Sequence, residues 1–152
     1  MIYKKSFFIF SAILIIFFIV FYLNNIAREE CSLRLEKKEL IFGDILFEVE
    51  IADTQKAKEC GLSYRKELQH DAGMLFVFGK SDFHGIWMKE MRFSIDIIWL
   101  DENFYVIDVQ KNISPESYPT IFIPQEKTWY VLELNAGSSE EYSIHIGEKF
   151  IF

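Results

Sequence analysis

The feature that most constrains this chain is an uncharged apolar run near its N-terminus. Phe7 to Leu23 contains 17 residues without a charge, a glycine or a proline. As a helix the run would be about 26 Å long, which is enough to cross a thin hydrocarbon layer. A helix that is apolar on every side is typical of a membrane span, because a helix in water needs only one apolar face. The sequence therefore predicts a single N-terminal transmembrane helix within residues 1–28.

A cleaved signal peptide is the alternative interpretation of the same run. The apolar region of such a peptide is usually about 7–15 residues long and ends at a small-x-small cleavage site. The best candidate site has Ala27 at the cut and Asn25 two residues before it, and asparagine fits that position poorly. The charged residues between Ala27 and Cys31 do not resemble a lipoprotein signal either. We therefore expect an uncleaved signal anchor.

The charges around the run predict its orientation and exclude one class of partner. Lys4 and Lys5 precede the run, and membrane proteins carry an excess of lysine and arginine on the cytoplasmic side. We therefore expect a single-pass membrane protein with a cytoplasmic N-terminus and a periplasmic or extracellular C-terminal domain. The net charge of the chain is −7, and −9 without these two lysines. A domain this acidic is repelled by phosphate backbones, so we expect no nucleic-acid partner and attachment to the membrane through Phe7 to Leu23.

The rest of the chain divides into a short polar stalk, residues 29–38, and one domain, residues 39–152. Within the domain, short apolar or alternating runs are separated by turn signals, which is typical of a mainly β protein. Gly43-Asp44 lies between two such runs and predicts a tight hairpin, because glycine supplies the positive φ of the first turn position. In the second run apolar residues alternate with glutamates, which indicates a strand with one wet face.

Two short helices are expected beside the strands. Gln55 to Cys60 follows a capping residue, Asp53 or Thr54, and ends at Gly61. Ser138-x-x-Glu141 has the spacing of a capping box and predicts one helical turn. Further strands are expected at residues 74–78, 83–89, 95–100, 104–109 and 129–134, with a terminal strand at 150–152. This pattern predicts an all-β, or mainly β, sandwich or barrel with one or two short helices.

One run is predicted to build the core of the domain. Residues 74–78 are apolar at every position, which suits a strand that is buried on both faces, although a short apolar run alone does not exclude a helix. The residues are Met74, Leu75, Phe76, Val77 and Phe78.

The two cysteines are Cys31, in the predicted stalk, and Cys60, at the end of the predicted helix. An oxidising compartment outside the cytoplasm would allow a disulfide to persist. Nothing in the sequence brings the two residues together, however. We therefore expect two separate thiols rather than a disulfide.

Several separate motifs between about Leu46 and Phe152 are similar to those of one known family. The motifs are Gly61-Leu62, Arg65, Gly73-Met74-Leu75-Phe76-Val77-Phe78, Trp87-Met88-Lys89, Ser94-Ile95-Asp96-Ile97 and Leu132-Glu133-Leu134-Asn135-Ala136-Gly137. The chain resembles the domain-of-unknown-function 192 family, a set of small, mostly exported bacterial and archaeal domains without an established activity. The resemblance implies a compact, mostly β domain of jelly-roll-like sandwich type with one or two short helices.

The chain departs from the family pattern at three places. After Trp87-Met88-Lys89 the family usually continues with Asn-Thr, whereas Glu90 and Met91 follow here. The Pro-Leu-Asp of the family is Ser94-Ile95-Asp96 in this chain, and its Gly-Leu-Met is Gly61-Leu62-Ser63. An Asn-Thr pair is well suited to bind a ligand or to stabilise a turn. Its loss indicates a member that keeps the fold and differs in specificity.

Four charged residues match charged positions of the family pattern, namely Arg65, Lys89, Asp96 and Glu133. Asp96 lies among apolar residues, and a charge there is costly to bury unless it is paired. The structural interpretation is an ion pair with Lys89 or Arg65, or an aspartate that accepts backbone N–H bonds. The functional interpretation is a ligand contact, or an acid–base pair of Asp96 with Glu133 in a hydrolase. We expect the structural role and assign no catalytic residue.

Trp87 joins these four as a candidate binding residue. The aromatic residues outside the anchor, Trp87 and Trp99 among them, suit either a sugar-stacking platform or a core with large side chains. Met88-x-x-Met91 near His84 would suit Cu(I), but a lone methionine pair is weak evidence and the histidines lack ligand spacing. There is no glycine-rich phosphate loop, Gly-x-Ser-x-Gly elbow or Cys-x-x-Cys, so we expect no metal and no cofactor.

These patterns predict a membrane-anchored, non-catalytic binding module for an envelope glycan, a peptide or a protein partner. The alternatives are a hydrolase that uses Asp96 and Glu133, and a structural envelope protein.

Overall fold

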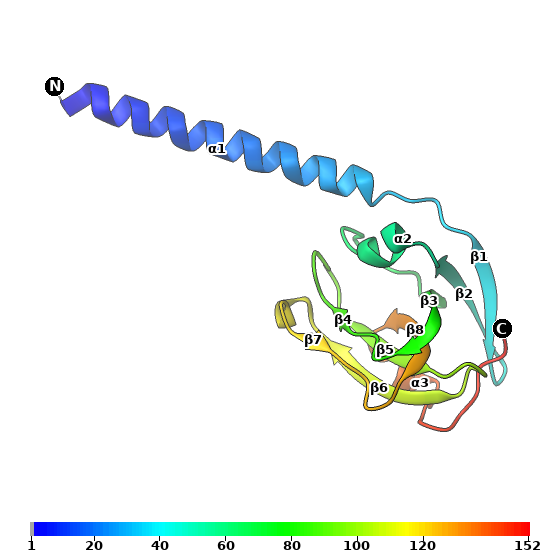
Figure 1. The fold of residues 1–152 in the computed structure, drawn as a ribbon. Helices are drawn as coiled ribbons and strands as arrows, with labels where there is room; N and C mark the ends of the chain where they lie inside the picture. Colours follow the sequence, from blue (N-terminus) through cyan, green and yellow to red (C-terminus); the bar gives the residue numbers. More distant parts are fainter. Residues whose placement is uncertain (1) are drawn as a thin grey trace. The chain divides into compact units, whose positions relative to one another are not determined.

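The computed structural model describes the backbone of residues 2–152 and the side chains of residues 13–152, in two compact units, residues 1–33 and 34–152. The first unit contains helix α1, Ile2–Glu30, which is blue in Figure 1. Among the residues whose side chains are described, no helix has both the length and the apolar character that a membrane crossing needs. The predicted span of Phe7 to Leu23 begins outside these residues, and its anchoring role is not supported by them.

The second unit is built on a six-stranded sheet with the strand order β1-β2-β3-β8-β5-β6. Its strands are β1 Lys37–Phe42, β2 Ile45–Ala52, β3 Ala72–Asp82, β5 Ile95–Leu100, β6 Val106–Ile113 and β8 Thr128–Asn135. A separate two-stranded sheet pairs β4, Ile86–Trp87, with β7, Ile121–Phe122. The short helices are α2 Gln55–Cys60, the 3-10 turn η1 Pro115–Ser117 and α3 Ser138–Glu141. The mainly β prediction is therefore confirmed.

The local predictions near the start of the domain are confirmed. Gly43 turns the β1–β2 hairpin with φ +57°. Helix α2 has the predicted bounds, its cap is Thr54, whose side-chain oxygen accepts the N–H of Ala57 at 3.1 Å, and it ends at Gly61 with φ +50°.

The sheet differs from a purely antiparallel jelly-roll sandwich. Strands β2 and β3 run parallel to each other, whereas the other neighbouring strands of the large sheet are antiparallel. A parallel pair cannot be joined by a hairpin and needs a crossover connection, which α2 and the loop to Ala72 supply. The sheet is therefore mixed.

Two predicted strands are shorter than expected. Only Ile86–Trp87 of the run 83–89 pairs with another strand. At the C-terminus, Ile151 forms one bridge with Ile41 through two reciprocal 2.8 Å backbone hydrogen bonds. Figure 1 shows this red end of the chain beside β1.

Both faces of the central strands are buried, because side chains alternate between the two faces of a sheet. Leu75 and Leu132 are fully buried in one hydrophobic core, together with residues of β1, β2 and the C-terminal segment. Met74 and Phe76 are buried on the opposite face. The predicted core run is confirmed for Met74 to Phe76, whereas Val77 and Phe78 are only partly buried.

The described chain contains no free cysteine. Cys31 and Cys60 are both disulfide-bonded, so the prediction of two separate thiols is wrong. The sequence did not indicate this, because pairing depends on proximity in the fold.

Candidate functional site

A small cleft of about 90 Å³ opens on the face of the sheet that bears Phe76. Its walls come from α2 and the following loop, from β3, from β4 with the loop after it, and from β8. The residues that line it are Lys58, Glu59, Cys60, Gly61, Leu62, Ser63, Phe76, Phe78, Gly85, Ile86, Trp87, Met91 and Glu133. Most of the wall is therefore apolar, and Glu133 comes from the centre of the sheet.

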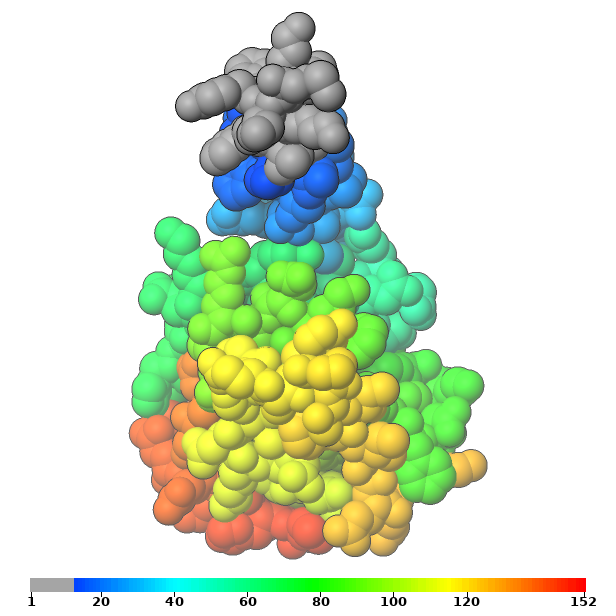
Figure 2. All heavy atoms as spheres, turned by 90° about the vertical axis from the view of Figure 1, so that its left-hand side faces the viewer, coloured from blue at the N-terminus to red at the C-terminus, as the bar shows by residue number. Residues whose placement is uncertain are grey.

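Two glycines allow the walls of the cleft to approach each other. A Cβ atom on Gly61 would lie 3.3 Å from the Phe76 ring, and the positive φ of Gly61 also favours glycine. A Cβ atom on Gly85 would lie 2.7 Å from the side chain of Ile121, so a larger residue would push β4 away from β7. Figure 2 shows the yellow segment that includes β7 at the surface of the domain, toward the viewer.

Glu133 is the buried acid of the cleft. It lies between Met74 and Ile97 in the registers of β3 and β5, and only 4% of the residue is exposed. None of the described residues forms a hydrogen bond with its carboxyl group. Burial raises the pKa of Glu133 to about 8, and the nearby Arg65 guanidinium offsets this only in part. The carboxyl group is therefore largely protonated at neutral pH.

Arg65 binds a second acid on the same face of the sheet. Its Nη1 and Nη2 atoms donate to the two carboxylate oxygens of Glu50 at 2.5 and 2.8 Å. This bond holds the pKa of Glu50 below its usual value, against the opposing effect of burial. Glu50 lies beside Met74, which in turn lies beside Glu133. The sequence placed Glu50 on a wet face, and no local signal could have shown that a loop arginine covers it.

Asp96 has a structural role. It is fully buried, and its Oδ1 atom accepts the backbone N–H groups of Asn112 at 2.8 Å and Gly137 at 3.2 Å. Its Oδ2 atom accepts the N–H of Ser139 at 2.7 Å. The carboxylate thereby caps the start of α3, where Gly137 offers no side chain. The expectation that Asp96 accepts backbone N–H bonds is confirmed, whereas the proposed ion pair with Lys89 or Arg65 is wrong.

Asp96 and Glu133 do not meet. In the register of β5 and β8, Asp96 is opposite Leu134 and Glu133 is opposite Ile97. Because opposite residues share a face and successive residues alternate, the two carboxyl groups lie on opposite faces of the sheet. The alternative of an acid–base pair of Asp96 with Glu133 in a hydrolase is therefore wrong.

Trp87 lies at the cleft with Lys89 beside it. The Trp87 residue is 46% exposed, and its ring contacts Tyr118 edge-on at 6.0 Å between centroids. The Nζ atom of Lys89 lies 5.5 Å from the centre of the Trp87 ring. Trp99, another candidate for a sugar platform, is fully buried and donates its indole N–H to the carbonyl of His84 at 2.7 Å.

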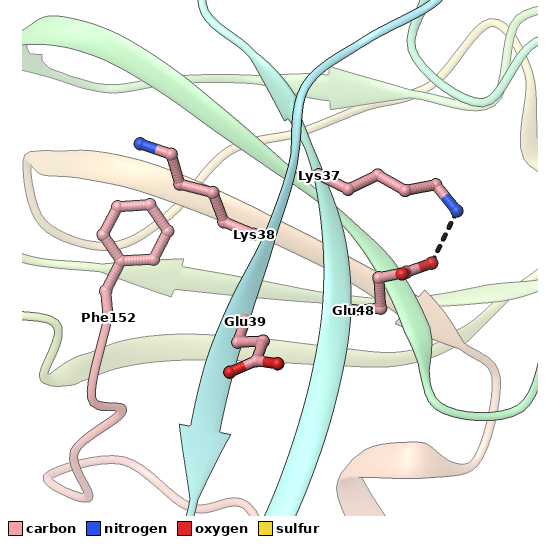
Figure 3. A pocket seen from close by; sticks show the side chains of 5 residues that line it. All are labelled: Lys37, Lys38, Glu39, Glu48 and Phe152. Atoms are coloured by element: carbon pink, nitrogen blue, oxygen red, sulfur yellow. Dashed lines mark hydrogen bonds and ion pairs between the residues drawn. The ribbon is translucent and has the colours of Figure 1, made fainter.

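A second hollow, of about 670 Å³, lies along the edge strand β1. Figure 3 shows the residues that line it, which are Lys37, Lys38, Glu39, Glu48 and Phe152. Lys37 forms a 2.5 Å ion pair with Glu48, and Lys38 lies over the Phe152 ring at 5.4 Å. The hollow is open and its lysines are already engaged, so it is the weaker candidate for a site.

The predicted site residues thus fall into two groups. Trp87 and Glu133 line one cleft, with Arg65 close enough to Glu133 to affect its pKa and Lys89 next to Trp87. Asp96 lies apart from them. The sequence did not indicate Phe78 and Met91 as cleft residues. Among the residues with described side chains, no cluster of three or more histidine, cysteine or acidic residues could hold a metal ion.

Comparisons with known proteins agree on one family. Residues 39–152 match the model of DUF192, described as uncharacterized ACR. A UPF0127 protein of Pyrococcus horikoshii is 32% identical over 107 residues, which are 67% of this chain and 84% of that protein.

Two crystal structures have a similar fold. One is of a proposed transcription regulator from Sinorhizobium meliloti, with a TM-score of 0.73 and 29% identity over 79% of this chain and 96% of that one. The other is of a protein of unknown function from Novosphingobium aromaticivorans, with a TM-score of 0.73 and 27% identity over 78% of this chain and 86% of that one.

Proposed function

The chain belongs to the DUF192 family, and on this premise we propose that its domain is a non-catalytic binding module that receives one side chain of an envelope polypeptide in the cleft. The observation that carries the proposal is the combination of Trp87 and Glu133 in one cleft. A half-exposed tryptophan offers a large contact area at little entropic cost, and a buried acid without a hydrogen-bond partner offers a specific polar contact.

The size of the cleft favours a side chain over a sugar ring. Its volume of about 90 Å³ is well below the roughly 300–1,000 Å³ of pockets that enclose whole small ligands, which suits the end of a single side chain. A sugar needs an open aromatic face, and Trp99 is buried in the core. The exposed pair of Trp87 and Tyr118 is the feature that favours a glycan instead, and a glycan is therefore an outcome of the test.

The proposal includes a place in the cell. The domain would lie outside the cytoplasm, held by an anchor from Phe7 to Leu23 whose lysines, Lys4 and Lys5, stay inside. The disulfide-bonded state of Cys31 and Cys60 supports an oxidising compartment. Protease added to intact cells should then degrade the domain and spare the anchor. A mature protein that begins near Arg28 would contradict the anchor.

Binding can be tested by NMR on the full-length protein in detergent micelles. The signals to follow are the indole N–H of Trp87 and the methyl group of Met91, which both lie at the cleft. The probes are N-acetylnorleucine N-methylamide, a peptide-like compound with an unbranched apolar side chain, and chitobiose, a disaccharide. We expect the peptide probe to shift both signals at millimolar concentration.

The Trp87→Ala variant should lose this response at the Met91 methyl group. Tyr105→Ala is the matched control, because Tyr105 is an aromatic residue of similar exposure, 41% against 46%, that does not line the cleft. The proposal fails if no peptide-like probe shifts either signal. A response to chitobiose alone would replace the polypeptide with a glycan.

A further inference from the structure

Glu133 places a buried acid in a cleft whose walls are mostly apolar. The acid is 4% exposed, lines the cleft and has no hydrogen bond with any described residue. A buried polar group without a partner costs stability, which is commonly tolerated where a ligand supplies the partner. A ligand group that donates hydrogen bonds and carries a positive charge would supply the missing hydrogen bonds and would stabilise the ionised form of this carboxyl group.

The aromatic walls also favour a cation. Phe76 and Phe78 stack at 6.4 Å between centroids, and Trp87 lines the same cleft. Two ammonium groups of the protein already lie over these rings, Lys58 Nζ at 5.4 Å from the Phe78 ring and Lys89 Nζ at 5.5 Å from the Trp87 ring. The negative face of an aromatic ring attracts cations at such distances.

Two cationic side chains near the cleft, those of Arg65 and Lys58, are already bound to other groups of the protein. Arg65 is bound by both of its terminal nitrogens to Glu50, so its charge is largely balanced. Lys58 donates to the carbonyl oxygens of Asp53 and Val77 at 2.8 and 2.9 Å.

Glu59 also lines the cleft, but it is exposed and its Oε1 atom accepts a 2.7 Å hydrogen bond from Gln55. The charge of Arg65 is therefore largely balanced by Glu50, whereas Lys58 and Glu59 are hydrogen-bonded to other groups. Arg65 is the cation that acts on the charge of Glu133, and it donates no hydrogen bond to this carboxyl group.

We propose, on the basis of the binding function proposed above, that the cleft receives the ammonium group of a polypeptide lysine side chain, with Glu133 as its carboxylate partner. The ammonium group and the last methylene groups fit a volume of about 90 Å³. The rest of the aliphatic stem lies along Trp87 at the opening, since long cationic side chains pack their stems on apolar surfaces.

This pairing couples binding to pH. The free protein holds a proton on Glu133 below pH 8, because its pKa is about 8. The bound ammonium group favours the ionised carboxylate, so binding below pH 8 releases this proton. Affinity for a lysine should therefore fall about tenfold for each pH unit below 8. The lysine ammonium group itself, with a pKa of about 10.4, keeps its charge throughout this range.

The test compares two probes on the full-length protein in detergent micelles between pH 6 and 8.5. N-acetyllysine N-methylamide carries the ammonium group, and N-acetylnorleucine N-methylamide keeps the stem without it. Dissociation constants come from the NMR signals of Trp87 and Met91, and proton release comes from calorimetry in buffers of different ionisation enthalpy. We expect tighter binding of the lysine probe at pH 8, with the tenfold pH dependence only for this probe.

Two variants test whether the preference for lysine and its pH dependence come from the carboxyl group of Glu133. Glu133→Gln should remove both the preference for lysine and its pH dependence. Glu102→Gln makes the same change of charge at an exposed acid that does not line the cleft, and should keep both. The pH dependence of the parent protein tests the proposal even if Glu133→Gln does not fold.

The outcomes distinguish a failure of the ammonium inference from a failure of the proposed binding function. If norleucine binds as tightly as lysine at every pH, the cleft is a binding site and the ammonium inference is wrong. If neither probe binds, the binding function fails as well. A lysine preference that Glu133→Gln keeps would also overturn the assignment to Glu133.

Discussion

Replacement of Asp96 by asparagine should destabilise the domain severely. The amide oxygen of asparagine can take the place of Oδ1 and keep the N–H groups of Asn112 and Gly137. The amide nitrogen then faces the N–H of Ser139, so two donors meet where a 2.7 Å hydrogen bond was. The opposite orientation of the amide loses two bonds instead of one. The site is fully buried, so water cannot repair the loss.

The magnitude follows from the bonds that change. A hydrogen bond to a charged group contributes about 1.5–3 kcal/mol, and a neutral one about 0.5–1.5 kcal/mol. Loss of the Ser139 bond and weakening of the other two should therefore cost about 3–5 kcal/mol. This is a large part of the roughly 5–15 kcal/mol by which domains are usually stable. The melting temperature should fall by about 10–20 °C.

Chemical and thermal unfolding of the parent and the variant measure this cost. Asp101→Asn is the matched control, because both of its backbone bonds, from Asn103 and Tyr105, go to one oxygen at 2.8 Å. An asparagine can keep both, so this variant should change the stability by less than about 1 kcal/mol. An Asp96→Asn protein as stable as the parent would refute the structural role of the carboxylate.

Three further predictions follow from the structure. Glu133→Gln should stabilise the protein by an amount that grows as the pH rises from about 5 to about 8, by up to about 1.4 kcal/mol per pH unit. The reason is that Glu133 has a pKa of about 8 in the folded protein and of about 4.5 in the unfolded chain, so the stability of the parent falls as the pH rises between these values. A stability difference between variant and parent that does not change with pH in urea titrations would count against this prediction. Lys89→Met should change the unfolding free energy by less than about 1 kcal/mol, because Lys89 is exposed and contacts Trp87 rather than Asp96. A loss of stability equal to that of Asp96→Asn would instead indicate that Lys89 and Asp96 form an ion pair. Phe76→Ala should cost about 3–5 kcal/mol in the same assay, since only 3% of Phe76 is exposed, and an unchanged melting curve would contradict its place in the core.

Local signals account for the parts of the fold that the sequence predicted well. Gly43 and Gly61 mark backbone conformations that glycine favours, and Thr54 caps a helix two residues after the end of β2. The alternation of β2 identified its buried face correctly. In each of these cases the residues that determine the structure are neighbours in the chain.

The interactions that define the candidate site connect distant segments instead. Asp96 binds N–H groups 16, 41 and 43 residues away, so its partners could not be read from its own strand. The burial of Glu133 depends on the register of β8 with β3 and β5. The sequence therefore indicated which charged residues were unusual, but not which of them share a cleft.

The order of the strands has a consequence for how the domain forms. The central strand β3 pairs Gly73 with Leu134 on β8, and Ile41 at the outer edge pairs with Ile151. Pairings between such distant residues close large loops, which slows folding. During synthesis β3 therefore emerges well before β8, and its edge stays open until nearly the whole domain has left the ribosome. Until β8 is available, the unpaired edge of β3 can pair with another chain, so this edge is the part of the folding domain most exposed to aggregation.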